Sequence, residues 1–287
     1  MKRPRAESLL FASFSLLLAV LAAPAAFAAS GGAQACSAAL SNLQSADASL
    51  RRQAADDLSG LSCPDAQAPL VSALGDSDAS VRAAAARSVG LLRDSDALAP
   101  LEKMLASDAD ASARAAAAAS LTYLGSQSSA PALIKALSDP DAGVRYAAVR
   151  ALSVLRSADS VPALVALLKS GDSGLRRTVA AALGRIGGPQ ALAALRGLLS
   201  GSDSSVKFQA AAALAFQKDA SGRDVLLGAL ASSPDAATRE QAANALALVG
   251  TPADVSALQS ALDSEKDPDA KAVIGAAIKR LSSAASN

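Results

Sequence analysis

Polar and apolar positions form blocks along most of this chain, and the blocks recur at a fixed interval. The segment DPDAGVRYAAVRAL (139–152) shows the pattern, with a polar turn followed by apolar residues at helical spacing. Val144, Ala148, Leu152 and the following Leu155 fall on one face of a helix. No stretch of useful length alternates with the period of two that a half-buried strand requires. The pattern therefore predicts an all-α protein.

Seven further segments share this pattern. Each has a cation at the position of Arg145 and an aspartate four residues earlier. The cations are Arg51, Arg82, Arg114, Arg145, Arg176, Lys207, Arg239 and Lys271, and the aspartates are Asp47, Asp78, Asp110, Asp141, Asp172, Asp203, Asp235 and Asp267. Successive cations lie 31 or 32 residues apart. A near-constant period over eight copies predicts a repeat protein.

A second apolar segment lies between successive cations, and four of these segments contain proline, at positions 69, 100, 131 and 162. Proline is well tolerated in the first turn of a helix. Each unit is therefore predicted to be a short helix, a polar turn and a longer helix. Such units bury their apolar faces only by stacking. We expect one right-handed α-solenoid of about eight two-helix units over residues 34–282, with tails at 29–33 and 283–287.

The aspartates and cations of the repeat could be either catalytic groups or structural ones. A catalytic site needs one special copy, whereas all eight copies carry the same pair. An aspartate at this position fits the N-cap of the longer helix, where a good cap is worth about 1 kcal/mol. An ion pair between the aspartate and the cation four residues later would add only about 0.2–0.5 kcal/mol. We therefore expect caps, with ion pairing as a secondary effect.

The fullest copies, DSDASVRAAAARSVGLL (76–92) and DPDAGVRYAAVRALSVL (139–155), resemble HEAT repeats of the short type named after phycobilisome lyases. The resemblance implies a hydrogen-bonded ladder between each arginine and a turn aspartate of the neighbouring repeat. The matching aspartates are Asp76, Asp108 and Asp139, whereas Ser170, Gly201, Ser233 and Glu265 occupy this position in later copies. The ladder is therefore an open question in the second half of the chain.

The resemblance also implies that the second helices line the concave face of the solenoid. Residues one, two and five positions after the cation should then point inward. They are mostly alanine in early copies, such as Ala83, Ala84, Ala115, Ala116 and Ala119. Later copies carry larger groups, which form our candidate protein-binding patch: Tyr146, Arg150, Arg177, Phe208, Gln209, Glu240, Gln241 and Asn244. Aromatic and arginine side chains often dominate binding energies, although these residues could equally cover neighbouring helices or remain solvated.

Composition excludes several kinds of active site. The chain of 287 residues contains no His, which removes imidazole bases, His metal ligands and Ser-His-Asp triads. Related short-repeat proteins include a di-iron hydroxylase with His-Glu motifs, which this chain lacks, and bilin lyases, which would require a reactive thiol or a cleft that grips the ring. The chain also has no phosphate-binding loop or dinucleotide fingerprint. We expect no catalytic, cofactor-binding or metal site.

The first 28 residues have the pattern of an export signal. Lys2, Arg3 and Arg5 precede a largely apolar run over 9–23, and Ala26-Phe27-Ala28 is typical of a cleavage site. An uncleaved anchor helix is the alternative, although the run is shorter than the roughly 20 residues that span a membrane. A lipoprotein modified at Cys36 would lack the usual leucine before the cysteine. The rest of the chain carries 24 basic and 25 acidic residues without a basic cluster, so neither nucleic acid nor a membrane surface is expected as a partner.

Export changes what the two cysteines predict. Cys36 should lie at the start of the first helix and Cys63 just beyond the end of the second, which are neighbouring positions in a helical hairpin. An oxidising compartment favours a disulfide between them, and two free thiols are the alternative. The leading hypothesis is an exported, periplasmic or secreted, bacterial scaffold that binds a protein or peptide on its concave face. A lyase-like enzyme or accessory and a purely structural envelope component are the alternatives.

Overall fold

The computed structural model describes residues 32–61 and 63–284, and within these ranges the chain is helical and contains no strand. The expected signal segment at 1–28 lies outside the described residues. Residues 32 and 33, which precede the expected start of the array, are already helical, and α16 ends two residues into the expected C-terminal tail. The all-α prediction is confirmed.

The helices follow one another in pairs. The first helices are residues 32–42, α3 (Gln67–Ala73), α5 (Leu98–Ser107), α7 (Ala130–Ala136), α9 (Val161–Leu167), α11 (Pro189–Leu198), α13 (Arg223–Ser232) and α15 (Val255–Ser264). The second helices are α2 (Ala48–Leu58), α4 (Ala79–Leu91), α6 (Ala111–Leu124), α8 (Ala142–Leu155), α10 (Ser173–Ile186), α12 (Ser204–Phe216), α14 (Ala236–Val249) and α16 (Pro268–Ala284). Single 3-10 turns lead into most first helices: Pro64–Ala66, Ser95–Ala97, Gln127–Ser129, Ala158–Ser160, Ala220–Gly222 and Pro252–Asp254.

An aspartate lies at the start of every second helix. The carboxylate of Asp78 accepts a hydrogen bond from the backbone N–H of Ser80 at 2.8 Å, and that of Asp141 accepts one from Val144 at 3.1 Å. The same arrangement precedes the other second helices, α16 included. Because these N–H groups have no partner within the helix, the caps satisfy them.

The prediction of a secondary ion pair between each cap aspartate and the cation four residues later was wrong. In the described part of the chain, no repeat cation forms an ion pair with its own cap aspartate. The carboxylate instead accepts from the N–H groups of its own helix, and five of the cations bond a carboxylate of the next repeat: Arg51, Arg82, Arg114, Arg176 and Arg239.

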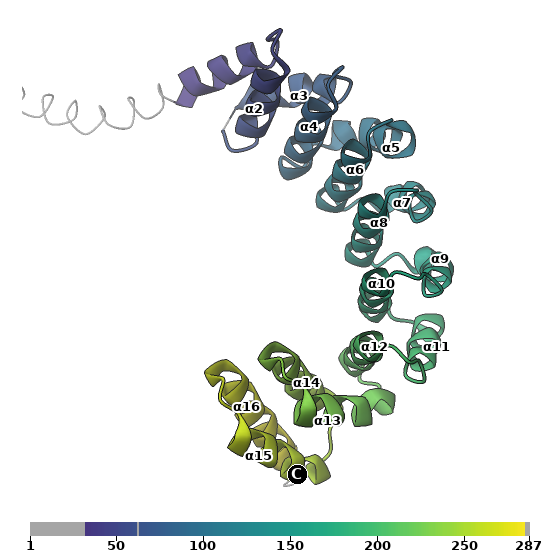
Figure 1. Cartoon of the computed structure of the whole chain (residues 1–287). Helices are drawn as coiled ribbons and strands as arrows, with labels where there is room; N and C mark the ends of the chain where they lie inside the picture. The colour runs from purple at the N-terminus through teal and green to yellow at the C-terminus, as the bar shows by residue number, and fades with distance from the viewer. Residues whose placement is uncertain (1–31, 62, 285–287) are drawn as a thin grey trace, which may run out of the picture.

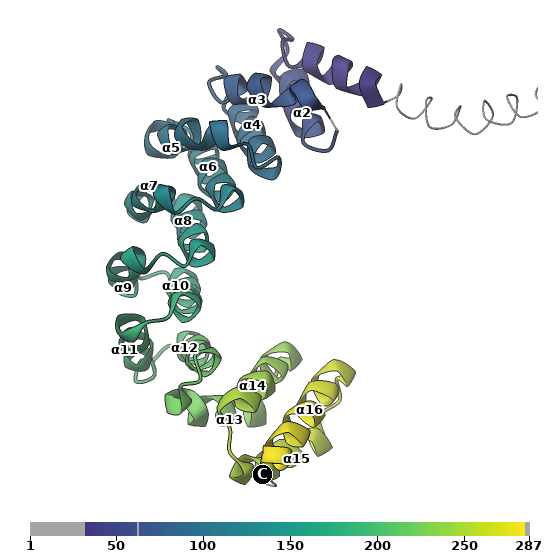
Figure 2. The ribbon, with the colours of Figure 1, turned by 180° about the vertical axis from the view of Figure 1, so that it is seen from behind.

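The stacked pairs form an arc in which the second helices lie on the inner side and the first helices on the outer side (Figure 1). The same arrangement is visible from behind, with α2 and α16 at opposite ends of the hollow (Figure 2). The second helices therefore line the concave face. Among the described residues, none of the helices combines the length and apolar character needed to cross a bilayer.

Leucine side chains from both layers form the core. Most helices place one leucine that is fully buried between the two layers: Leu58, Leu70, Leu101, Leu121, Leu133, Leu152, Leu164, Leu183, Leu195, Leu214, Leu226, Leu246 and Leu258. Small residues separate neighbouring second helices, and a Cβ added at Gly90 of α4 would lie only 2.8 Å from the Cβ of Ser120 on α6. The alanine-rich sequence therefore allows the second helices to pack closely.

The core consists of two apolar clusters that meet at α12. Ala210 and Leu214 belong to the cluster that extends back to the N-terminal repeats, whereas Ala211 and Ala215 belong to the C-terminal one. Helix α12 is therefore the joint between two packed segments of one continuous array.

A disulfide joins the first two helices. Cys36 lies in the helix over 32–42 and Cys63 follows α2, with a Cα–Cα distance of 5.6 Å and a sequence separation of 27 residues. The predicted pairing is confirmed. Because the first repeat packs against a neighbour on one side only, the bond secures an end of the array that packing alone leaves weak.

Candidate functional site on the concave face

Three arginine–aspartate contacts join successive repeats of the N-terminal half, and we call each such contact between repeats a rung of the ladder. Arg51 donates to Asp76 through Nε (2.7 Å) and Nη2 (2.8 Å), and Arg82 and Arg114 make the same two bonds to Asp108 and Asp139. Paired bonds of this geometry are the strongest that arginine forms with a carboxylate. In each case the arginine lowers the pKa of the aspartate below its usual value.

The ladder is interrupted after α8. Ser170 replaces the acceptor that Arg145 would need. Among the residues that the structure describes, the Arg145 side chain bonds only the carbonyls of Asp139 and Pro140. Tyr146 instead donates from its hydroxyl to the cap carboxylate of Asp172, at 3.1 and 3.2 Å. Burial and this contact raise the pKa of Tyr146. Gly174 leaves the room that the tyrosine hydroxyl occupies.

The next rung is rerouted. Gly201 has no carboxylate, and Arg176 donates to the cap aspartate Asp203 at 2.7 Å. Asp203 also accepts bonds from the hydroxyls of Ser173 and Ser205. These two hydroxyls, followed by the N–H of Val206 and by Arg176, lower the pKa of Asp203 strongly.

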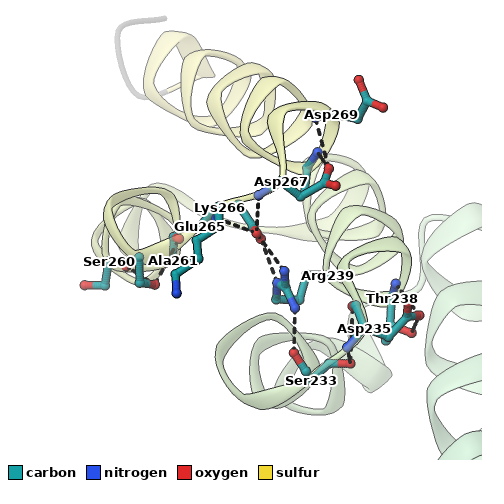
Figure 3. Close-up of polar contacts among 12 residues, drawn as sticks. Ser233, Asp235, Thr238, Arg239, Ser260, Ala261, Glu265, Lys266, Asp267 and Asp269 are labelled. Carbon is teal, nitrogen blue, oxygen red and sulfur yellow. Dashed lines mark hydrogen bonds and ion pairs between the residues drawn. The ribbon is translucent and has the colours of Figure 1, made fainter.

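The following rung is missing and the last one is restored. Lys207 has no ion pair among the described residues, and the matching acceptor position holds Ser233. Arg239 then makes two bonds of 2.6 Å to Glu265 (Figure 3). Glu265 also accepts from the N–H groups of Lys266 and Asp267. The bond from Arg239, followed by these two backbone bonds, lowers the pKa of Glu265 to about 2. A glutamate thus substitutes for the aspartate.

A groove of about 720 Å³ opens on the concave side where the rungs are irregular. Its charged lining consists of Arg150 and Arg177, neither of which has an ion pair or hydrogen bond within the described part of the chain. Phe208 contributes an aromatic surface, and the remaining lining is Thr178, Ala181, Ser204, Ser205, Gln209, Ala229, Ser232, Ser233, Pro234, Thr238 and Gln241. The lining contains no carboxylate, so the groove is suited to bind rather than to transfer protons.

Five residues of the predicted patch line this groove: Arg150, Arg177, Phe208, Gln209 and Gln241. Tyr146, Glu240 and Asn244 do not line it. Tyr146 is half-buried, and its hydroxyl donates a hydrogen bond to Asp172. The structure therefore brings together the part of the patch on α10 and α12 with one residue each from α8 and α14.

The groove also contains residues that the sequence analysis did not select. Ser232, Ser233 and Pro234 come from the end of α13 and the turn after it, which close the groove beside α12. The available signal was Ser233 itself, since it marks a copy that lost its ladder carboxylate. A smaller groove of about 230 Å³ adjoins the first at Arg150 and Thr178, and includes Val154 and Arg185.

Comparison with protein families identifies the repeats. A family model of HEAT repeats matches residues 37–122, 103–173, 130–215 and 197–279. These matches cover most of the chain, which therefore belongs to the HEAT repeat family. The resemblance inferred from the repeat motif is confirmed. No curated protein sequence matches this chain.

Solved structures give the same fold. The complex of CpcE and CpcF of phycocyanin lyase from Nostoc matches with a TM-score of 0.54 and 27% identity, over 75% of this chain and 94% of the matched chain. YibA of Escherichia coli matches with a TM-score of 0.62 and 19% identity, over 98% and 99%. An engineered protein matches with a TM-score of 0.53 and 25% identity, over 87% and 79%.

Proposed function

We propose that this protein is a non-enzymatic scaffold that binds a protein or peptide partner in the groove between α8 and α14. The observation that carries the proposal is the groove itself, where two exposed arginines flank a half-buried phenylalanine. Neither arginine has an acidic partner in the ranges 32–61 and 63–284. Interfaces are enriched in these two residue types. Polar side chains around them provide donors and acceptors that could fix the orientation of a bound chain.

The scaffold is proposed to work outside the cytoplasm, in the periplasm or as a secreted protein. Two features support this location: the export pattern of residues 1–28 and the disulfide between Cys36 and Cys63. Disulfides persist in oxidising compartments and are rare in the reducing cytosol.

Affinity capture from the native envelope, followed by mass spectrometry, tests the proposal. The wild-type protein should retain a defined partner, and the variant Arg150→Glu/Arg177→Glu/Phe208→Ala should lose it. The matched control is Lys135→Glu/Lys169→Glu, which reverses two exposed charges outside the groove, on the outer helix α7 and just after α9. Circular dichroism and a melting curve would verify that both variants are folded. Equal retention by both variants would rule out the groove as the binding site.

A lyase-like enzyme or enzyme accessory is the second candidate. The similarity to the phycocyanin lyase complex, at 27% identity, favours it. This function predicts that the purified protein binds a bilin and changes the absorption spectrum of the pigment. If neither a partner nor a pigment is retained, a purely structural role in the envelope would account for the fold.

A further inference from the structure

A row of large apolar side chains runs along the inner surface, one for each of five second helices. Each lies nine residues after its repeat cation and is substantially exposed: Leu91 (54%), Tyr123 (49%), Val154 (50%), Phe216 (63%) and Leu248 (39%). The same position on α10 holds Arg185. We call these six residues the inner row. Isolated exposed apolar residues are ordinary, but a periodic set is not.

The inner row faces the hollow of the arc. On α8 the residues around Val154, namely Ser153 and Leu155, are buried, whereas Arg150, one turn earlier on the same face, is exposed. Val154 and Arg185, from neighbouring helices, line one small groove together with Arg150. Val154 and Arg185 are therefore adjacent in space, the other members occupy the equivalent position of successive stacked repeats, and the row adjoins the larger groove at Arg150.

The distance between successive members of the inner row indicates which backbone conformation of a bound peptide would fit it. Packed helices lie about 8–10 Å apart, so the row offers one contact at about that interval. A polyproline II chain rises about 3.1 Å per residue with three residues per turn, so every third side chain lies on one face about 9.3 Å apart. A β-strand would place every third residue on the opposite face. A helix would present contacts about every 5.4 Å and leave half of them uncovered.

The arginines near the interruption of the ladder indicate where a bound peptide should carry a negative charge. Arg185, Arg150 and Arg177 have no acidic partner among the described residues. In the N-terminal half, by contrast, Arg87 is paired with Asp56 at 3.0 Å. A carboxylate opposite Arg185 would supply the missing countercharge.

We infer that the inner row binds an extended peptide of polyproline II type, with an apolar side chain at every third position and a carboxylate where it passes Arg185. This inference rests on the proposed function and names the chemistry of the partner. Spanning all six positions takes about 16 residues, at about 3.1 Å each over five steps of about 10 Å.

Fluorescence anisotropy with synthetic peptides of this length provides the test. One peptide carries leucine at every third position and aspartate opposite Arg185, in a polar and proline-rich background. Two versions place the aspartate for the two possible chain directions. A control peptide of the same composition carries its leucines at every second position. We expect the first design, in one direction, to bind at least about tenfold more tightly than the control, because only polyproline II aligns its leucines with the row.

Exchanging charges tests whether the aspartate of the peptide lies opposite Arg185. Replacing the aspartate by lysine should weaken binding to the wild-type protein by about tenfold, and Arg185→Glu should reverse this preference. Tyr123→Ser/Phe216→Ser should weaken both peptides, and because both residues are exposed the variant should fold. Equal binding of the two leucine spacings, or no reversal by Arg185→Glu, would overturn the inference.

Other occupants give distinct results. Tighter binding of an amphipathic helical peptide, or of a peptide with the sequence of residues 8–28, would contradict the inference. Dimerisation of the protein that is abolished by Tyr123→Ser/Phe216→Ser would show that a second copy covers the row. The variant Tyr123→Ser/Phe216→Ser can also be compared with Arg150→Glu/Arg177→Glu/Phe208→Ala in the capture experiment. If the first retains the envelope partner and the second loses it, this inference fails and the proposed function stands. If both variants retain the partner, both fail.

Discussion

From α2 to α8, each repeat is joined to the next by an arginine that makes two bonds to an aspartate, whereas from α8 to α14 two of the three rungs are missing and the third is rerouted. Side chains on the inner surface also differ between the two regions. At the position directly after the repeat cation, α4 and α6 hold Ala83 and Ala115, whereas α10 and α12 hold Arg177 and Phe208. Large and charged side chains at this position thus coincide with irregular rungs, which supports the proposal that the second region is adapted to recognition at a cost in stability.

The second region has other connections between repeats. Arg196 on α11 pairs with Asp219, and Arg223 on α13 pairs with Asp254. These ion pairs lie between first helices and the turns that follow the second helices. These ion pairs join neighbouring repeats of the second region outside the ladder.

Acid should have the largest effect, because it removes all four regular rungs together, three between α2 and α8 and one between α14 and α16. Hydrogen bonds from arginine lower the pKa values of Asp76, Asp108, Asp139 and Glu265 in the folded state. A lowered folded pKa contributes stability that is present above the unfolded pKa and is lost as the pH falls through the folded value. For Glu265 this window runs from 4.5 down to about 2. Urea titrations across this range should show falling stability.

Glu265→Gln provides the control for the acid experiment. Glutamine cannot titrate, so the loss of stability between pH 4.5 and about 2 should be smaller in this variant than in the wild type. An unchanged slope would show that the last rung does not contribute to the pH dependence.

Loss of the disulfide should have the next largest effect and should affect the N-terminal end alone. Closing a loop of 27 residues stabilises the folded state by about 3 kcal/mol in the chain-entropy model. Cys36→Ser/Cys63→Ser should therefore speed hydrogen exchange in α2 and α4 and leave α14 and α16 unchanged. Uniform acceleration along the array would instead indicate that all repeats unfold as one unit.

Removing a regular rung should cost more than altering an irregular one. Asp139→Ala leaves Arg114 without its acceptor and removes a bond to the N–H of Asp141, with an expected loss of about 2 kcal/mol. Ser170→Ala removes only the bond to the N–H of Asp172 and should cost about 0.5 kcal/mol. Comparable losses in denaturant titrations would remove the distinction between the two regions.

Installing the missing acceptor should give a smaller effect of opposite sign. Ser170 already accepts from Asp172 N–H in the way that Asp139 accepts from Asp141, so Ser170→Asp can keep this bond and offer Arg145 a carboxylate. We expect a gain of about 1 kcal/mol. Ser170→Asn is the control, because it adds a polar group of similar size without charge and should give little gain.

Much of this fold was predictable because the repeat period fixes which residues are buried. The caps, the two helical layers and the disulfide follow from local sequence and from hairpin geometry. The rerouted bond from Arg176 to Asp203 was not predictable, because it depends on the reach of one side chain across the interface. The groove walls at Ser232–Pro234 were missed because they come from a different helix pair. The inner row lies nine residues after six of the eight repeat cations, and the apolar pattern alone does not distinguish its exposed side chains from buried ones.

The double variant Lys207→Arg/Ser233→Asp tests most directly whether the second region sacrifices rungs for recognition. It restores an arginine–aspartate rung and places a carboxylate in the wall of the groove that Arg150 and Arg177 also line. We expect a higher melting temperature together with weaker retention of the partner that the wild-type protein captures. A stabilised variant that retains the partner as well as the wild type does would contradict it.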